Sequence, residues 1–373
     1  MSNLKAPSIN IVFNERANTV LTRGERGIVG LVLQDDVLQG KEFTVLDGTD
    51  VPNTISDANK KLIEKALIGN TTAPKKIICY VMELDTNDMP DYDKAIEWVE
   101  NSICDIVAFS KVATDGKVAD VATEIKAMRN RHKRIMVVLP ECAGDHEGIV
   151  GWYGKSYDDI GVEIPKEDYC ARIAGAIAGT GLTSSICYMT LSDVKNCERL
   201  SDAEIDTAVG EGKLIPMWDG EKVKIVNDVT TFQTITDTKN NSYKVIKLVR
   251  DMDMVYSDIY TLIRDTYTGK YVNSYDNQCV LLSAVNSYLK RCVEDQIFSQ
   301  AHAEFNIPAK RKWVKENIER YPDKFVDDEG NRLVYENMTD NDIKKCWSSD
   351  KLFYLGHLGM LDTMKEFDFE FVI

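Results

Sequence analysis

Residues 76–191 alternate between short apolar runs and amphipathic stretches, and this alternation limits the fold more than any other feature of the chain. Four apolar runs have the length and composition of buried strands, at residues 76–82, 105–109, 134–139 and 184–191. Three stretches place apolar residues at helical spacing, at residues 91–103, 118–128 and 168–179. Continuously apolar strands that alternate with helices favour a mainly parallel sheet covered by helices.

The segments before this region extend the same pattern. Gly24 and Gly27 predict a turn that leads into an apolar strand ending near Leu33. Ser56 is expected to cap the N-terminus of a helix, and Gly69 follows the last apolar residue of that helix, as a C-terminal stop would.

The pattern changes after about residue 200. Ser201 and Glu204 have the spacing of a capping box, and residues 212–236 are rich in strand formers. Two long amphipathic helices follow, and then a polar, turn-rich stretch at 306–350 and a strand-like run at 352–361. We therefore predict α/β and α+β domains with a boundary near 200–212. The expected division is an N-terminal arm, an α/β domain, an α+β domain and a C-terminal arm, at residues 1–20, 21–205, 206–361 and 362–373.

Both ends of the chain have the sequence of a strand. Ile9, Ile11 and Phe13 alternate with other residues near the start, and Phe367, Phe369, Phe371 and Ile373 alternate with Asp368, Glu370 and Val372 at the end. A terminal strand needs a sheet to join, and unpaired strand edges can pair between chains. A chain with such a strand at each end is a candidate for a linked polymer.

Composition narrows the possible functions. The formal net charge of −15 argues against binding of nucleic acid by the surface as a whole. No apolar run approaches the ~20 residues that span a bilayer, so no membrane insertion is expected. The first residues lack the apolar core of a secretory signal. The nine cysteines form no C-x-x-C pair, which is typical of reduced, buried thiols.

The segment Gly175–Ser184 is the strongest candidate for a ligand site. Its glycines resemble those of a phosphate-binding loop, but it lacks the lysine, and the glycines lie within and after a helix rather than before one. Close helix packing is the simpler explanation. The alternative, an α/β nucleotide- or phosphate-binding enzyme that uses this segment, stays open.

The other candidate chemistry is weaker. Cys142 and His146 are the only close pair of soft metal ligands, and a polar loop is the simpler interpretation. Asp251, Asp253 and Asp258 fall on one of the long helices, where we expect them on its solvated side rather than as an acid–base pair. We predict no catalytic residue, no metal and no cofactor.

One basic cluster stands out from the acidic background, and it follows Pro308: Lys310, Arg311, Lys312 and Lys315. It has the position of a solvated helix start. The alternative is an electrostatic docking surface for an acidic partner.

Several motifs together resemble contractile phage tail sheath proteins. Residues 171–188 (ARIAGAIAGTGLTSSICY) are similar to the family stretch A-R-x-A-G-x-I-A-x-T-P-L-x-x-S-x-T-Y, with Gly181 in place of the proline. Further segments are similar to family motifs in the same order, at residues 23–29, 227–232, 247–253, 267–273 and 362–369. The resemblance spans nearly the whole chain, but residues 301–350 match no part of the pattern.

The resemblance implies a structural subunit rather than an enzyme. Family members polymerise as helically stacked rings around a tail tube and contract to drive the tube through a target envelope. The α/β domain would lie outside and the α+β domain would face the tube, while the two arms add strands to sheets of neighbouring subunits. The site residues would then be the arm residues Ile9, Ile11, Phe13, Phe367, Phe369 and Phe371, with Lys310, Arg311, Lys312 and Lys315 docking on the tube or an adjacent subunit.

The implied partners are other copies of the chain, the tail tube protein, and baseplate and tail-terminator proteins. Assembly would take place in a bacterial cytoplasm, followed by release in a virion or a phage-tail-like bacteriocin particle. Besides the enzyme, a non-contractile tail or capsid component remains a third hypothesis.

Overall fold

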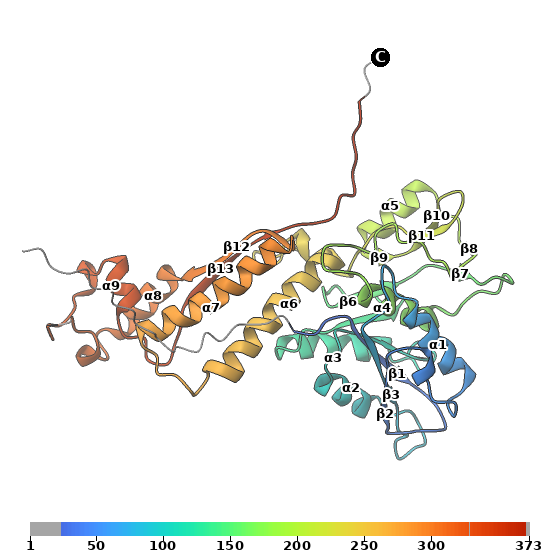
Figure 1. Ribbon diagram of the computed structural model, residues 1–373, viewed down its shortest axis with the longest axis horizontal. Coiled ribbons are helices and arrows are strands. Elements are labelled where there is room, and N and C mark those ends of the chain that lie inside the picture. The colour runs from blue at the N-terminus through green and yellow to red at the C-terminus, as the bar shows by residue number, and fades with distance from the viewer. Residues whose placement is uncertain (1–23, 328, 371–373) are drawn as a thin grey trace, which may run out of the picture. The chain divides into compact units, whose positions relative to one another are not determined.

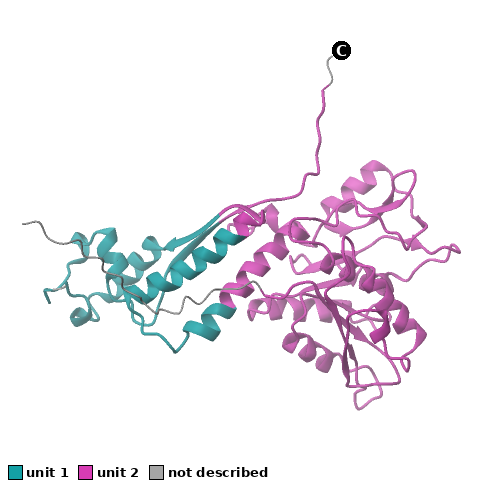
Figure 2. Cartoon of the chain, in the orientation of Figure 1, with its two compact units in different colours: residues 1–22, 261–291, 301–357 teal, residues 23–260, 292–300, 358–373 magenta. Residues whose placement is uncertain are grey.

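The computed structural model describes residues 24–327 and 329–370, and these form parts of two compact units (Figure 2). Within the described range, the larger unit comprises residues 24–260, 292–300 and 358–370, and the smaller one comprises residues 261–291 and 301–357. The chain crosses from one unit to the other within two helices and two strands, α6 (Ile246–Leu262), α7 (Tyr275–Glu294), β12 (Phe298–Phe305) and β13 (Tyr354–Met360).

A seven-stranded sheet forms the centre of the larger unit, in the order β2-β3-β1-β4-β5-β6-β9. Its strands are β1 (Ile28–Leu33), β2 (Glu42–Val45), β3 (Lys76–Val81), β4 (Ile106–Phe109), β5 (Met136–Pro140), β6 (Ile149–Trp152) and β9 (Lys213–Leu214). All neighbouring pairs are parallel except β2 with β3. The mainly parallel sheet that the sequence predicts is therefore confirmed.

Helices cover both faces of this sheet (Figure 1). One apolar core includes residues of α1 (Asp57–Leu67) and α4 (Lys166–Ala178), and a second core on the opposite face includes residues of α2 (Tyr92–Asn101) and α3 (Val118–Asn130). Ser56 caps α1 as predicted, because its side chain accepts a hydrogen bond from the Asn59 amide. The predicted capping box of Ser201 and Glu204 begins α5 (Asp202–Gly210).

The strand predicted at residues 184–191 is wrong. This segment is irregular and makes a single bridge, from Thr190 to Lys224. Tyr188 has a φ of 57°, which breaks an extended run, while Ile186, Met189 and Leu191 are buried in the core beside α4. The apolar residues reflect burial in that core rather than membership of a sheet. Short strands in the same region are β7 (Ser156–Tyr157), β8 (Asn196–Cys197), β10 (Pro216–Trp218) and β11 (Val223–Ile225).

The compact units do not divide at the predicted boundary near 200–212. Residues 213–214 form β9 at the edge of the large sheet, so the chain on both sides of that boundary belongs to one unit. The limits 21–205 and 206–361 stay a prediction about domains of an assembly.

The smaller unit has its own apolar core at residues 306–350. It contains α8 (Ile307–Asn317) and α9 (Asp340–Lys345), packed through Val314, Phe325 and Ile343. The strand-like run predicted at 352–361 is confirmed as β13, which pairs with β12. Among the described residues, no helix combines the length and apolar character needed to cross a membrane.

Candidate functional site

The C-terminal segment is exposed, and residues 361–370 pair with no strand in the part of the chain that the structure describes. Residues 361–370 adopt no regular secondary structure. Phe367 and Phe369 are 66% and 75% exposed, and their rings stack with centroids 6.4 Å apart. The other predicted arm residues, Ile9, Ile11, Phe13 and Phe371, lie outside the described residues. Two large aromatic side chains on an extended segment are available to another surface, but their pairing in a sheet stays a prediction.

Two lysines hold the root of this segment on the larger unit. The buried Lys247 on α6 donates from Nζ to the carbonyl oxygen of Leu361 at 2.6 Å and forms an ion pair with Asp251 at 2.8 Å. Lys365 Nζ lies 2.6 Å from Asp228 and 3.0 Å from Asp362. Burial lowers the pKa of Lys365, but the carboxylates of Asp228 and Asp362 together outweigh that effect, so the net shift of the pKa is upward. We call these four side chains, Lys247, Asp251, Lys365 and Asp228, the arm clamp.

The basic cluster after Pro308 divides into buried and exposed members. Lys310 is only 2% exposed, and its Nζ donates to the backbone oxygen of Lys344 at 2.8 Å. The prediction that Lys310 docks on a partner is therefore wrong, because its amino group is buried inside the smaller unit and bonded to a backbone oxygen there. Arg311 pairs with Asp340 at 2.7 Å, whereas Lys312 and Lys315 are exposed.

The helical part of the segment Gly175–Ser184 packs closely against neighbouring backbone and does not form a phosphate-binding loop. A Cβ atom at Gly175 would lie 2.0 Å from the Ala66 carbonyl oxygen on α1, and one at Gly179 would lie 2.2 Å from the Thr72 oxygen. Both contacts require glycine because the backbones approach too closely for a side chain. Gly179 is also the residue at which α4 ends.

The three acids of α6 are not on a solvated face, so that expectation is wrong. Asp251 is 0% and Asp258 is 4% exposed. Asp253 receives two hydrogen bonds from Arg129, at 2.7 and 2.8 Å, and Asp258 pairs with Arg26 at 2.8 Å. Each acid faces a base, because a buried carboxylate without a counter-charge is costly. Sequence reasoning missed these pairs, and only the i, i+4 spacing of Lys247 and Asp251 offered a signal.

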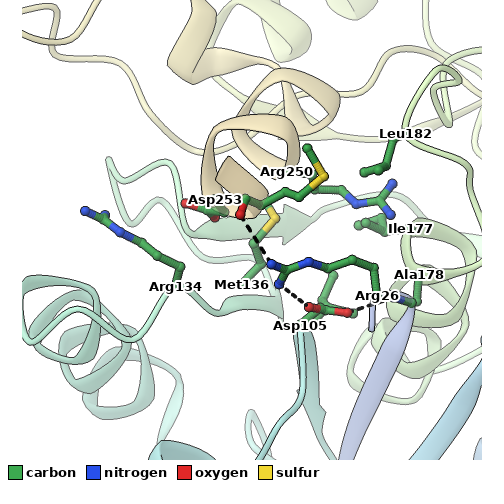
Figure 3. A pocket seen from close by; sticks show the side chains of 12 residues that line it. Arg26, Asp105, Arg134, Met136, Ile177, Ala178, Leu182, Arg250 and Asp253 are labelled. Carbon is green, nitrogen blue, oxygen red and sulfur yellow. Dashed lines mark hydrogen bonds and ion pairs between the residues drawn. The ribbon is translucent and has the colours of Figure 1, made fainter. Parts of the chain in front are cut away.

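Figure 3 shows a pocket beneath α6 in which several of these charges meet. Arg26 points at Asp105, with Nη1 3.2 Å from the carboxylate, and its Nη2 donates to the Met254 carbonyl oxygen at 3.3 Å (Figure 3). Arg250 extends from α6 toward Ile177 and Leu182, while Arg134 points away (Figure 3). The pocket is narrow, with a volume of about 30 Å³, close to what one water molecule requires.

The loop that carries Cys142 and His146 makes structural hydrogen bonds, and among the described residues its side chains do not converge as metal ligands. His146 accepts a hydrogen bond at Nδ1 from the Gly148 amide, and burial lowers its pKa to about 4. Asp145 accepts hydrogen bonds from the amides of residues 233 and 234. Burial raises the pKa of Cys142, which is the opposite of what an activated thiol requires.

Comparison with known proteins gives a consistent result. No protein-family model matches the chain. A tail sheath protein of Clostridium phage phiCD119 is 29% identical over 366 residues, which are 96% of this chain and 97% of that protein. The XkdK protein of the phage-like element PBSX of Bacillus subtilis is 27% identical over 173 residues, 45% of this chain and 37% of that protein.

Solved structures share the fold. The sheath tail protein of Desulfitobacterium hafniense has a TM-score of 0.65 at 17% identity and covers 80% of this chain and 93% of its own. The sheath tail protein of Listeria innocua has a TM-score of 0.63 at 14% identity, covering 93% and 98%. The helical sheath protein of the anti-feeding prophage in its contracted state has a TM-score of 0.68 at 12% identity, covering 99% of both chains.

The fold is thus that of sheath proteins from phage tails and contractile injection systems. The resemblance to the contractile phage tail sheath family, which the sequence motifs indicate, is confirmed by the match to a tail sheath protein over 96% of this chain and 97% of that protein.

Proposed function

We propose that the chain is the structural subunit of a contractile tail sheath, which polymerises as helically stacked rings around a tail tube and contracts to drive the tube through a target envelope. The observation that carries this proposal is the match to a tail sheath protein over 96% of this chain and 97% of that protein. Because the match covers 96% of the chain, it involves both compact units. The similar fold of a helical sheath solved in a contracted state favours this proposal over a non-contractile tail component.

The proposed linkage between subunits is strand addition by the two terminal arms. Phe367 and Phe369 are exposed on a segment that pairs with no strand within residues 24–327 and 329–370. Together with Phe371 and the N-terminal Ile9, Ile11 and Phe13, they would anchor sheets shared between copies. Backbone pairing links the copies, and the alternating side chains set the register.

No enzymatic step is part of this proposal. Gly175 supports that position, because its close packing against the backbone of α1 leaves no space beside it for a phosphate. The free energy of contraction would come from the metastable extended lattice, in which less interface is buried than in the contracted one. A purified chain should then show no thermal protection by nucleotides, and protection that Gly179→Val abolishes would favour the enzyme instead.

The proposed partners are other copies of the chain, the tail tube protein, and baseplate and tail-terminator proteins. Assembly would take place in a bacterial cytoplasm, and the sheath would leave the cell in a virion or a phage-tail-like particle. Within the basic cluster, Arg311, Lys312 and Lys315 remain candidates for docking on an acidic surface. Lys312→Glu together with Lys315→Glu should impair assembly on tubes at low salt, whereas Lys310→Met, which alters a buried charge, serves as the control.

Negative-stain electron microscopy tests the main proposal. The full chain and a version without residues 1–14 and 366–373 are each incubated with and without purified tail tubes. Hollow striated cylinders from the full chain and dispersed particles from the truncated one are expected. Dispersed particles from the full chain, even with tubes, would contradict the proposal.

A further inference from the structure

An open cavity in the larger unit is lined by three cationic side chains and, in the described part of the chain, by no acid. Arg26, Lys75 and Arg250 line it, with Thr72, Gly181 and Leu182 among its other walls. Its volume is about 360 Å³. A cationic cavity is unexpected on a chain whose formal net charge is −15. It adjoins the narrow pocket of Figure 3, with which it shares Arg26, Arg250 and Leu182.

Two of the three cations already have carboxylate partners. Arg26 pairs with Asp105 at 3.2 Å and with Asp258 at 2.8 Å. Lys75 pairs with Glu25 at 2.8 Å.

Arg250 differs, because the described residues give it no ion pair. Its Nη2 donates to the carbonyl oxygen of Thr180 at 3.0 Å. The two acids whose charges act on Arg250 are engaged elsewhere, Asp105 by Arg26 and Asp251 by Lys247. Burial lowers the pKa of Arg250, and these two carboxylates oppose that effect only from a distance. A guanidinium that is partly withdrawn from water without a counter-charge gains strongly from an oxyanion placed beside it.

The shape of the cavity favours a side chain over a lone ion. Its rim includes the exposed residues Thr72, Ala73 and Gly181, so it opens to solvent. A Cβ atom at Gly181 would meet nothing within 4 Å, so the space beside the rim is free for another backbone. The wall combines apolar Ala178 and Leu182 with the guanidinium, which suits the methylene groups and the carboxylate of an aspartate or glutamate.

We propose that this cavity receives a carboxylate side chain of a second copy of the chain, and that Arg250 binds it. The inference rests on the proposed polymer, which places an acidic surface of one copy against another. The chain carries 60 aspartate and glutamate residues against 45 lysine and arginine residues, so a second copy supplies carboxylates in excess. An arginine suits this role because its planar guanidinium binds a carboxylate through two hydrogen bonds.

Carbodiimide cross-linking tests the contact directly. Arg250→Lys keeps the charge and adds an amine, which the reagent couples only to a carboxylate in contact with it. A tagged Arg250→Lys chain is assembled as a minority among wild-type copies on tubes. We expect the tag to appear in a covalent band at twice the subunit mass, and mass spectrometry to join position 250 to an acid of the other copy. A tagged wild-type chain controls for coupling through Lys75 or other lysines.

Each result has a distinct meaning. If sheaths form but position 250 stays uncoupled, or couples only within its own chain, for example to Asp105 or Asp251, the inference about Arg250 is wrong and the proposed function stands. If wild-type chains never assemble on tubes, the proposed function fails and this inference fails with it. If position 250 couples to no other copy, and inorganic phosphate stabilises the wild-type chain but not Arg250→Gln in urea unfolding, the cavity binds a small anion and the proposal is overturned.

A second variant gives an independent readout. Arg250→Gln should lower the fraction of assembled chain by at least about tenfold, because it leaves the partner carboxylate without its counter-charge. Arg131→Gln is the matched control, since Arg131 is half exposed and pairs on the surface with Glu100 at 2.8 Å. Urea unfolding of both variants establishes that they are folded. Unchanged assembly of a folded Arg250→Gln chain would refute the interface.

Discussion

The arm clamp predicts where the C-terminal segment becomes free to move. Lys365 Nζ lies 2.6 Å from the carboxylate of Asp228, which is 1% exposed, and Lys365 itself is 20% exposed. Exposed ion pairs contribute about 0–1 kcal/mol, and breaking a buried one costs about 3–5 kcal/mol, so we use about 2 kcal/mol for this partly buried pair. Residues up to Lys365 should therefore stay on the larger unit, while residues 366–370 move.

Trypsin measures this directly, since cleavage after Lys365 requires that its side chain leave Asp228. Asp228→Asn removes the charge and keeps the size of the side chain. If opening is fast compared with cleavage, the loss of about 2 kcal/mol raises the cleavage rate by about 30-fold. The assay is mass spectrometry of the released peptide 366–373 over time, with cleavage after the exposed Lys351 as an internal reference.

Asp362→Asn is the matched control for this experiment. Asp362 also contacts Lys365, at 3.0 Å, but it is 34% exposed, so its removal should change the rate by no more than about threefold. Equal rates for wild type and Asp228→Asn would refute the clamp, and so would equal effects of the two variants.

Three further predictions concern the larger unit. Gly175→Ala should lower the free energy of unfolding in urea titrations by about 3 kcal/mol, because the new Cβ would lie 2.0 Å from a carbonyl oxygen of α1. Gly181→Ala is the control and should change this free energy little, because its Cβ meets open space. Burial raises the pKa of Asp251 from 3.8 to about 6, so its contribution to stability is present below pH 4 and is lost as the pH rises through 6. The stability of Asp251→Asn relative to wild type should therefore rise by about 2–3 kcal/mol between pH 4 and pH 7, and urea unfolding that showed no such rise would contradict this. Asp253→Asn leaves Arg129, whose side chain is 1% exposed, with only the more distant carboxylate of Glu147 at 3.7 Å, and should destabilise the chain by about 2 kcal/mol in the same assay.

The central sheet was predictable because its strands are buried on both faces. Such strands are continuously apolar, as in residues 76–81 and 136–140, and the signal survives without knowledge of neighbours. The same signal misled at residues 184–191, where apolar side chains are buried by an irregular segment. A buried irregular segment and a buried strand have the same apolar composition, so sequence alone does not separate them. The left-handed backbone at Tyr188 gave no signal either, because a tyrosine stands there rather than a glycine.

The charged residues were harder to place from sequence. Asp253 and Asp258 were expected in solvent, yet their partners Arg129 and Arg26 lie 124 and 232 residues away. No local spacing encodes such a pair. Lys310 shows the same limit, because its burial depends on a backbone oxygen 34 residues further along. Aromatic alternation in the C-terminal segment identified its exposed residues, but not the lysines that hold its root.

The C-terminal segment also has a consequence for the subunit before assembly. Phe367 and Phe369 are exposed, and between and around them stand Glu366, Asp368 and Glu370. Two identical segments that met side by side in register would bring like charges together, which is unfavourable in a strand pair. The acids therefore discourage free subunits from aggregating through their aromatic ends. A neutralised segment, with amides at these three positions, would lose that protection while keeping both phenylalanines.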